Sequence, residues 1–189
     1  MSNHALPHQP ERLSEATRIR KMSARLAGVC MALIVLLPLA VPYLWTADSA
    51  YLTRYANLQP NVLQQPIELW QRITGALLTE IPVLCMCFGL WHARSCLKGF
   101  AGGQLFTDEA VQYLRRFSVW IMWSAFAALL VSMLLSMILS YNNSPGTRQL
   151  AVGIGSDHLL MFFFAGLVWV MAGIIREARV IADENNSFI

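Results

Sequence analysis

The chain has 189 residues, of which 56% are hydrophobic and only 13% are charged. A soluble domain has about 25% charged residues, so this composition excludes a disordered chain and a highly charged water-facing surface, and four cysteines exclude a disulfide scaffold. The formal net charge of +3 is weak evidence for nucleic-acid binding. We expect no direct nucleic-acid partner and interpret the charge as a topology signal.

The apolar residues form four blocks that we predict to be membrane-spanning helices. Residues 26–46, 117–140 and 158–175 contain no charged residue, and residues 73–91 contain only Glu80. A bilayer core needs about 20 helical residues, and lipid offers the backbone no hydrogen-bond partners, so runs of this kind must be helical. The prediction is an all-α, four-helix transmembrane bundle with the lipid bilayer around it. Its spans lie at about residues 26–46, 73–95, 117–140 and 157–175, within a transmembrane domain at residues 26–175.

Residues 1–25 form a basic N-terminal tail, in which residues 12–25 predict a helix that continues into the first span. Such a helix attracts anionic lipid headgroups. Pro38 and Pro42 lie inside the first span and Pro82 inside the second, and each removes a backbone donor and bends its helix. Pro66 is placed to be the first residue of the helix that contains the second span.

Glu80 is the one ionisable residue well inside a predicted span. A charged, unpaired carboxylate is costly in the bilayer, so Glu80 defines a candidate intramembrane polar site, with His158, Ser136 and Ser140 as partners at the same level. Two hypotheses stay open. Glu80 is either a proton- or cation-responsive site, or a structural residue that snorkels or forms a hydrogen bond.

The connection between the second and third spans contains a predicted helix start. Gly102 and Gly103 interrupt the preceding helix, and Thr107 can cap the next one. Asp108 and Glu109 then lie in the first turn, where acidic residues complement the positive end of the helix dipole.

Small residues recur at four-residue spacing in the third span, which places them on one face of the helix. This groove serves either packing within the chain or homo-oligomerisation and contact with a partner helix. Shorter series occur at Ala24, Gly28 and Ala32 and at Gly166 and Gly173. The members of the main groove are Ser124, Ala128, Ser132, Ser136 and Ser140.

Residues 176–189 continue the fourth helix beyond the membrane, and Arg179 and Asp183 are spaced to form an i, i+4 ion pair. The basic residues also predict the orientation, because Lys and Arg near span ends stay in the cytoplasm. Most of the 14 Lys and Arg lie on the side of the two termini, which we therefore place inside. Those on this side are Arg12, Arg18, Arg20, Lys21, Arg25, Arg94, Lys98, Arg115, Arg116, Arg176 and Arg179.

No pattern of catalytic or ligating residues emerges, and we predict no enzyme, no cofactor and no metal site. A membrane thiol oxidase needs cysteine pairs outside, whereas Cys30, Cys85 and Cys87 lie within spans. A bis-histidine haem site needs two histidines at one depth, whereas His92 and His158 lie at opposite ends of their spans.

Three segments resemble a bacterial family of small membrane proteins. Residues 103–109 (Gly-Gln-Leu-Phe-Thr-Asp-Glu), followed by residues 114–116, resemble the Gly-x-x-Phe-Ser/Thr-x-Glu … Leu stretch before that family's third span. Residues 177–178 and 181–185, with the terminal Ile189, resemble its closing Glu-Ala … Glu-Asn-x-x-x-Val, and residues 81–82 match an Ile-Pro in its second span. The family is catalogued as domain-of-unknown-function twenty-nine seventy-five.

The resemblance covers roughly residues 20–189 and implies four spans in a bacterial cytoplasmic (inner) membrane, with no established activity. The chain departs from the family in ending Ser-Phe-Ile, where relatives more often end Leu-Thr-Val. Genes of this family often neighbour a small helix-turn-helix regulator, which implies a cytoplasmic protein partner.

We therefore expect a non-enzymatic interaction or regulatory protein that presents its cytoplasmic face to such a partner. The alternative is a small transport or permeation subunit that uses Glu80, and homo-oligomerisation remains a further option. The candidate partner surface consists of Phe106, Thr107, Glu109, Arg115, Arg116, Glu177, Asp183, Glu184 and Asn185.

Overall fold

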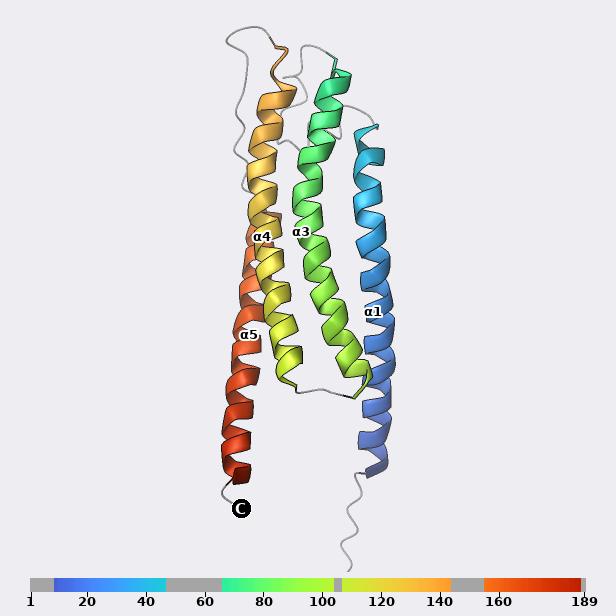
Figure 1. Ribbon diagram of the computed structural model, residues 1–189, viewed down its shortest axis with the longest axis vertical. Coiled ribbons are helices and arrows are strands. Elements are labelled where there is room, and N and C mark those ends of the chain that lie inside the picture. Colours follow the sequence, from blue (N-terminus) through green and yellow to red (C-terminus); the bar gives the residue numbers. More distant parts are fainter. Residues whose placement is uncertain (1–8, 47–65, 104–106, 144–154, 188–189) are drawn as a thin grey trace, which may run out of the picture.

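The computed structural model describes residues 9–46, 66–103, 107–143 and 155–187, and among these it describes all side chains except those of residues 9–16, 157 and 182–187. It contains the helices α1 (Gln9–Trp45), α3 (Leu69–Ala101), α4 (Asp108–Leu139) and α5 (Ser156–Ser187) (Figure 1). Each helix is long and apolar enough to cross a membrane. The all-α, four-helix prediction is confirmed, and the chain is a multi-pass membrane protein.

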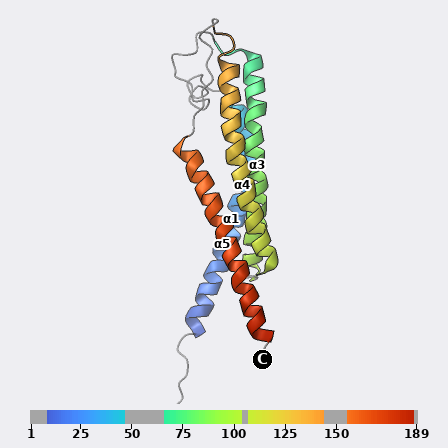
Figure 2. The ribbon, with the colours of Figure 1, turned by 90° about the vertical axis from the view of Figure 1, so that its left-hand side faces the viewer.

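The helices pack in chain order, α1 against α3, α3 against α4, and α4 against α5. The start of α1, the α3–α4 turn and the end of α5 lie at one end of the molecule, at the bottom of Figure 1. Figure 2 shows that α5 lies against α4 toward this end, whereas its first turns diverge from α4. We call it the basic end because it carries every described Lys and Arg side chain except Arg72. These are Arg18, Arg20, Lys21, Arg25, Arg94, Lys98, Arg115, Arg116, Arg176 and Arg179.

The main apolar cluster lies between α1, α3 and α4 toward the opposite end of the molecule. Val41 and Trp45 of α1 pack there with Val131, Leu135 and Leu139 of α4, and partly buried side chains of α3 lie against them. Burial of these side chains joins the three helices through van der Waals packing, which drives helix association in lipid.

Many large apolar side chains point outward instead, from all four helices. Leu36, Leu77, Met137 and Phe163 are each more than half exposed. In water such a surface would be unfavourable, but hydrocarbon chains solvate it well. The exposed faces are therefore the surfaces that contact lipid.

Side chains at the start of α3 donate hydrogen bonds to backbone carbonyls at the ends of both neighbouring helices. Gln71, which is only 1% exposed, donates a hydrogen bond from Nε2 to the Ile138 carbonyl near the end of α4, at 2.7 Å. Arg72 donates from Nη1 to the Trp45 carbonyl at the end of α1, also at 2.7 Å. The last carbonyls of a helix have no donor within that helix, and lipid supplies none. Arg72 provides such a donor to the Trp45 carbonyl, and Gln71 adds a second donor to the Ile138 carbonyl, which also accepts the Tyr141 amide at 3.3 Å.

A cysteine of α3 donates a hydrogen bond to a carbonyl inside α1 that lacks its helical donor. Pro38 has no amide hydrogen, so the Ile34 carbonyl one turn earlier lacks its helical donor. The Cys87 thiol of α3 donates to this oxygen, with Sγ at 3.7 Å. Cys87 therefore compensates for a proline in the neighbouring helix.

The two predicted helix starts differ in outcome. Thr107 is the N-cap of α4 and accepts the Ala110 amide on Oγ1 at 3.2 Å, with Asp108 and Glu109 in the first turn, so this prediction is confirmed. Pro66 is not the first helical residue of α3, and that prediction is wrong. The helix begins later, at Leu69, because Gln71 accepts the Glu68 amide on Oε1 at 2.9 Å and Glu68 thereby becomes the N-cap.

Candidate functional site

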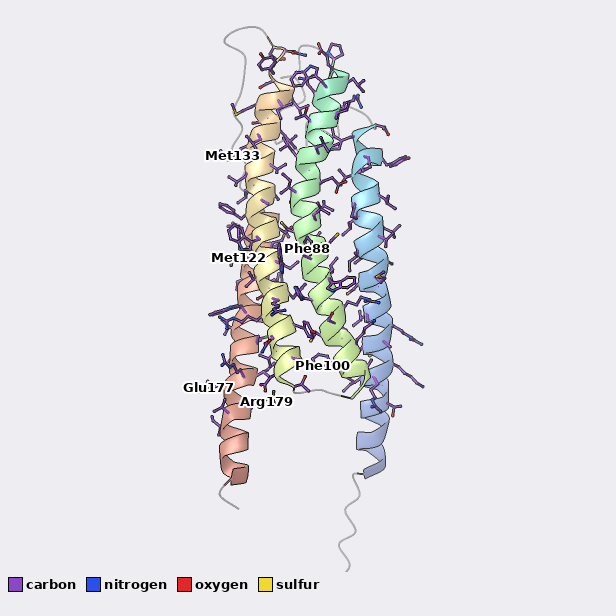
Figure 3. All side chains as sticks on the ribbon, viewed as in Figure 1. Phe88, Phe100, Met122, Met133, Glu177 and Arg179 are labelled. Carbon is purple, nitrogen blue, oxygen red and sulfur yellow. The ribbon has the colours of Figure 1, made fainter. Side chains whose placement is uncertain are left out.

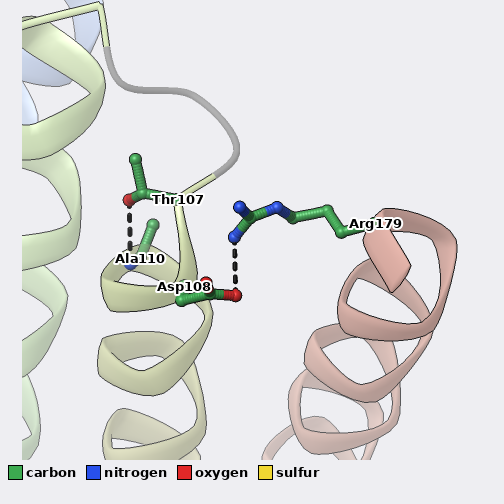
Figure 4. A network of polar contacts seen from close by, with 4 residues as sticks. All are labelled: Thr107, Asp108, Ala110 and Arg179. Carbon is green, nitrogen blue, oxygen red and sulfur yellow. Dashed lines mark hydrogen bonds and ion pairs between the residues drawn. The ribbon is translucent and has the colours of Figure 1, made fainter. Parts of the chain in front are cut away.

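The basic end brings the first turn of α4 and the end of α5 into direct contact. Arg179 Nη1 lies 2.7 Å from Asp108 Oδ1, as Figure 4 shows beside the Thr107 cap. The other partner that we predicted for Arg179, Asp183, lies outside the described side chains, so that pair stays a prediction. The start of α4 lies within reach of the Arg179 side chain, which therefore binds a carboxylate on a neighbouring helix.

An arginine also joins the start of α1 to the α3–α4 turn. Arg20 donates from Nη2 to the Gly102 carbonyl at 3.1 Å, just after α3 ends. Gly103 follows with a φ of +88°, a left-handed conformation that favours glycine, and a Cβ there would lie 2.5 Å from Arg20 Nη2. The predicted interruption at Gly102 and Gly103 is confirmed, and the arginine packs closely against it.

The other described residues of the candidate partner surface do not form a single cluster. Glu109 and Arg116 of α4 and Glu177 of α5 are exposed at the basic end, where Figure 3 labels Glu177 beside Arg179. Arg115 is also exposed but lies toward α5, with its guanidinium carbon 5.5 Å from the ring centroid of Trp169. Outside the described residues and side chains lie Phe106, Asp183, Glu184 and Asn185.

The candidate intramembrane site is not assembled. Glu80 Oε2 is buried and has no hydrogen-bond partner among the described residues. Ser136 donates to the Met133 carbonyl and Ser140 to the Ser136 carbonyl, each at 2.7 Å and each within α4. Among the described residues, Glu80 Oε2 therefore forms no hydrogen bond with either serine or with His158. The polar partners that we expected therefore do not reach this oxygen.

The small-residue groove of α4 is largely occupied within the chain. Ser124, Ser132, Ser136 and Ser140 are between 0 and 4% exposed, and Ala128 is half-buried. Ser124 Oγ donates to the Pro82 carbonyl of α3 at 2.8 Å, which fixes one contact across this face. We therefore place no contact between two copies of the chain on it.

The residues that sequence patterns missed act across helices. Arg20 contacts the residue that ends α3, and Gln71 and Trp169 contact residues on α4, and no spacing within their own helix distinguishes these three residues. Among the described residues, no group of three His, Cys, Asp or Glu side chains is placed to hold a metal ion.

Comparison with known proteins gives one match. The model of a family described as "Protein of unknown function (DUF2975)" matches residues 54–189, which is more than half of the chain. The match includes α3, α4 and α5 and begins after α1, later than the residue 20 that we expected. No curated protein and no solved structure matches the chain.

Proposed function

Because this chain belongs to the DUF2975 family, whose function is unknown, we propose from its own geometry that it is a non-enzymatic interaction protein of the bacterial inner membrane. Its basic end faces the cytoplasm and holds a protein partner there. The charge distribution supports this orientation, since Arg72 is the one described Lys or Arg side chain away from the basic end.

The observation that carries the proposal is the pair of helix extensions at the basic end. Helices α1 and α5 both continue past the α3–α4 turn in Figure 1. Each is tied to this turn by one arginine, α1 through Arg20 and Gly102, and α5 through Arg179 and Asp108. Helices held at such fixed positions present a recognition surface at lower entropic cost than a chain that must fold on binding.

The partner that we propose is the small helix-turn-helix regulator whose gene often neighbours genes of this family. Holding the regulator at the membrane would control its access to DNA without any catalytic step. Exposed charges of both signs at the basic end, including Glu109, Arg116 and Glu177, would set its orientation through complementary charges.

Site-directed photo-crosslinking in cells that co-express the neighbouring regulator tests this function. A photoreactive residue at the exposed Ala178 should form an adduct with the regulator, whereas one at Leu159, which is 60% exposed at the other end of α5, should not. The variant Asp108→Asn should reduce the adduct by up to about fivefold, because an exposed ion pair contributes about 0.2–1 kcal/mol.

The charge-swapped variant Asp108→Arg/Arg179→Asp keeps the ion pair and should recover the adduct that Asp108→Asn loses. Failure to form an adduct at Ala178, or equal adducts at Ala178 and Leu159, contradicts the proposed function.

The buried Oε2 of Glu80 favours one second candidate, a small transport or permeation subunit. In that case proton flux into liposomes under an imposed pH gradient should depend on the protein and fall to the protein-free level in Glu80→Gln. Glu109→Gln, which removes an exposed carboxylate outside the apolar spans, serves as the control. Flux that is unchanged in Glu80→Gln excludes this function.

A further inference from the structure

A groove with a volume of about 430 Å³ opens between α4 and α5 at the basic end. Arg115 lines it from α4, and Trp169, Gly173, Arg176 and Glu177 line it from α5. A Cβ added at Gly173 would meet no heavy atom within 4 Å, so this side of the groove is open.

The groove crosses the level at which the hydrocarbon region ends. The charge-free stretch of α5 ends at residue 175, and that of α4 begins at residue 117. Val170 and Ile174 belong to the charge-free stretch of α5, whereas Arg115 and Arg176 each lie just outside these stretches, and the Arg115 guanidinium extends along the groove to the Trp169 ring. This change from apolar to charged matches the change along a phospholipid from acyl chain to headgroup.

The charge of the groove favours an anion. The charged residues that line it are two arginines, Arg115 and Arg176, and one acidic residue, Glu177. The ion pair with Asp108 occupies Arg179, but no described carboxylate forms an ion pair with Arg115 or Arg176. The guanidinium carbon of Arg115 lies 5.5 Å from the centroid of the Trp169 ring, and a planar guanidinium can bind a phosphate through two N–H groups.

We propose that this groove binds one anionic phospholipid. The lipid phosphate lies between Arg115 and Arg176, and an acyl chain follows Val170, Gly173 and Ile174. The groove shares Glu177 with the charges proposed to orient the protein partner, but lipid binding requires neither the regulator nor the helix extensions beyond Glu177.

Native mass spectrometry of the full chain in detergent tests the site, with phosphatidylglycerol and phosphatidylcholine of identical acyl chains as probes. We expect one phosphatidylglycerol molecule to bind at least about fivefold more tightly than phosphatidylcholine, the difference that one basic residue contributes toward an anionic lipid. Equal binding of the two lipids overturns the anionic assignment.

Two matched pairs of variants locate the lipid. Arg115→Gln should weaken phosphatidylglycerol binding about fivefold, whereas Arg94→Gln should not, although Arg94 lies 5.6 Å from the Trp91 ring centroid in a similar pair. Gly173→Leu fills the groove without changing charge and should abolish binding. Gly166→Leu makes the same change on α5 at another position with open space and should retain it. Retained binding in Gly173→Leu, or equal losses in the members of either pair, overturns the proposal.

Discussion

Replacing Gly75 with leucine is expected to separate α1 from α3 and to destabilise the helix bundle. A Cβ at this position would overlap the six-membered ring of Trp45. The ring has no space to withdraw, because Trp45 is 5% exposed and packs in the cluster with Val131 and Leu135. Its Nε1 also donates to Thr79 Oγ1 at 3.2 Å, and this hydrogen bond is lost if the ring moves.

Overpacking of this kind costs about 1–3 kcal/mol, and sometimes more. At about 2–4 °C per kcal/mol for a chain of this size, the apparent melting temperature in detergent should fall by about 2–12 °C. Tryptophan fluorescence during a thermal ramp measures this change directly. Gly28→Leu is the matched control, because a Cβ at Gly28 of α1 meets nothing within 4 Å, and its melting temperature should match that of the unsubstituted protein. Equal melting temperatures for both variants contradict the described α1–α3 contact.

The helices and their ends were predictable from the sequence because their signals are local. Charge-free runs longer than about 18 residues have one stable conformation in lipid, and a Gly-Gly pair followed by Thr107, Asp108 and Glu109 contains both a stop and a start. The extension of the helices beyond the apolar runs could be predicted because no helix-breaking residue occurs there. These predictions needed no knowledge of how the helices pack.

The faces that meet were not predictable in the same way. On α1 the series Ala24, Gly28 and Ala32 is exposed, whereas Ser23 and Ala27 are buried. Small residues in a four-residue series line one face of a helix, and so do those in the series one position earlier. Which of the two faces is buried depends on where the neighbouring helix lies.

Helix α5 shows the same shift by one position. Gly166 and Gly173 are exposed, whereas Ala165 and Ala172 are 4% and 1% exposed. The partners of Arg20 and Arg179 were missed for a related reason. Long side chains contact whichever helix end lies within reach, and that end comes from a distant part of the sequence.

Both proposed functions of the basic end depend on the side of the membrane that it faces. Among the described residues, the ends of the bundle differ strongly in charge, with Arg72 as the one Lys or Arg side chain at the end opposite the basic end. Each basic residue that would have to cross the bilayer opposes the reversed orientation, so we expect a single topology with the start of α1 and the end of α5 in the cytoplasm.

Cysteine labelling in cells measures this topology with an all-or-none result. The native cysteines are first replaced by serine, which keeps a donor where Cys87 and Cys96 donate to backbone carbonyls. Single cysteines are then introduced by Thr46→Cys, beyond the end of α1, or by Ala178→Cys, on the extension of α5; both positions are exposed.

A membrane-impermeant maleimide is applied to cells with a permeabilised outer membrane and an intact inner membrane. The proposed orientation predicts that Thr46→Cys is labelled in these cells, and that Ala178→Cys is labelled only after the inner membrane is disrupted. Labelling of Ala178→Cys in intact cells, with Thr46→Cys protected, would contradict the cytoplasmic orientation of the basic end and the function proposed for it.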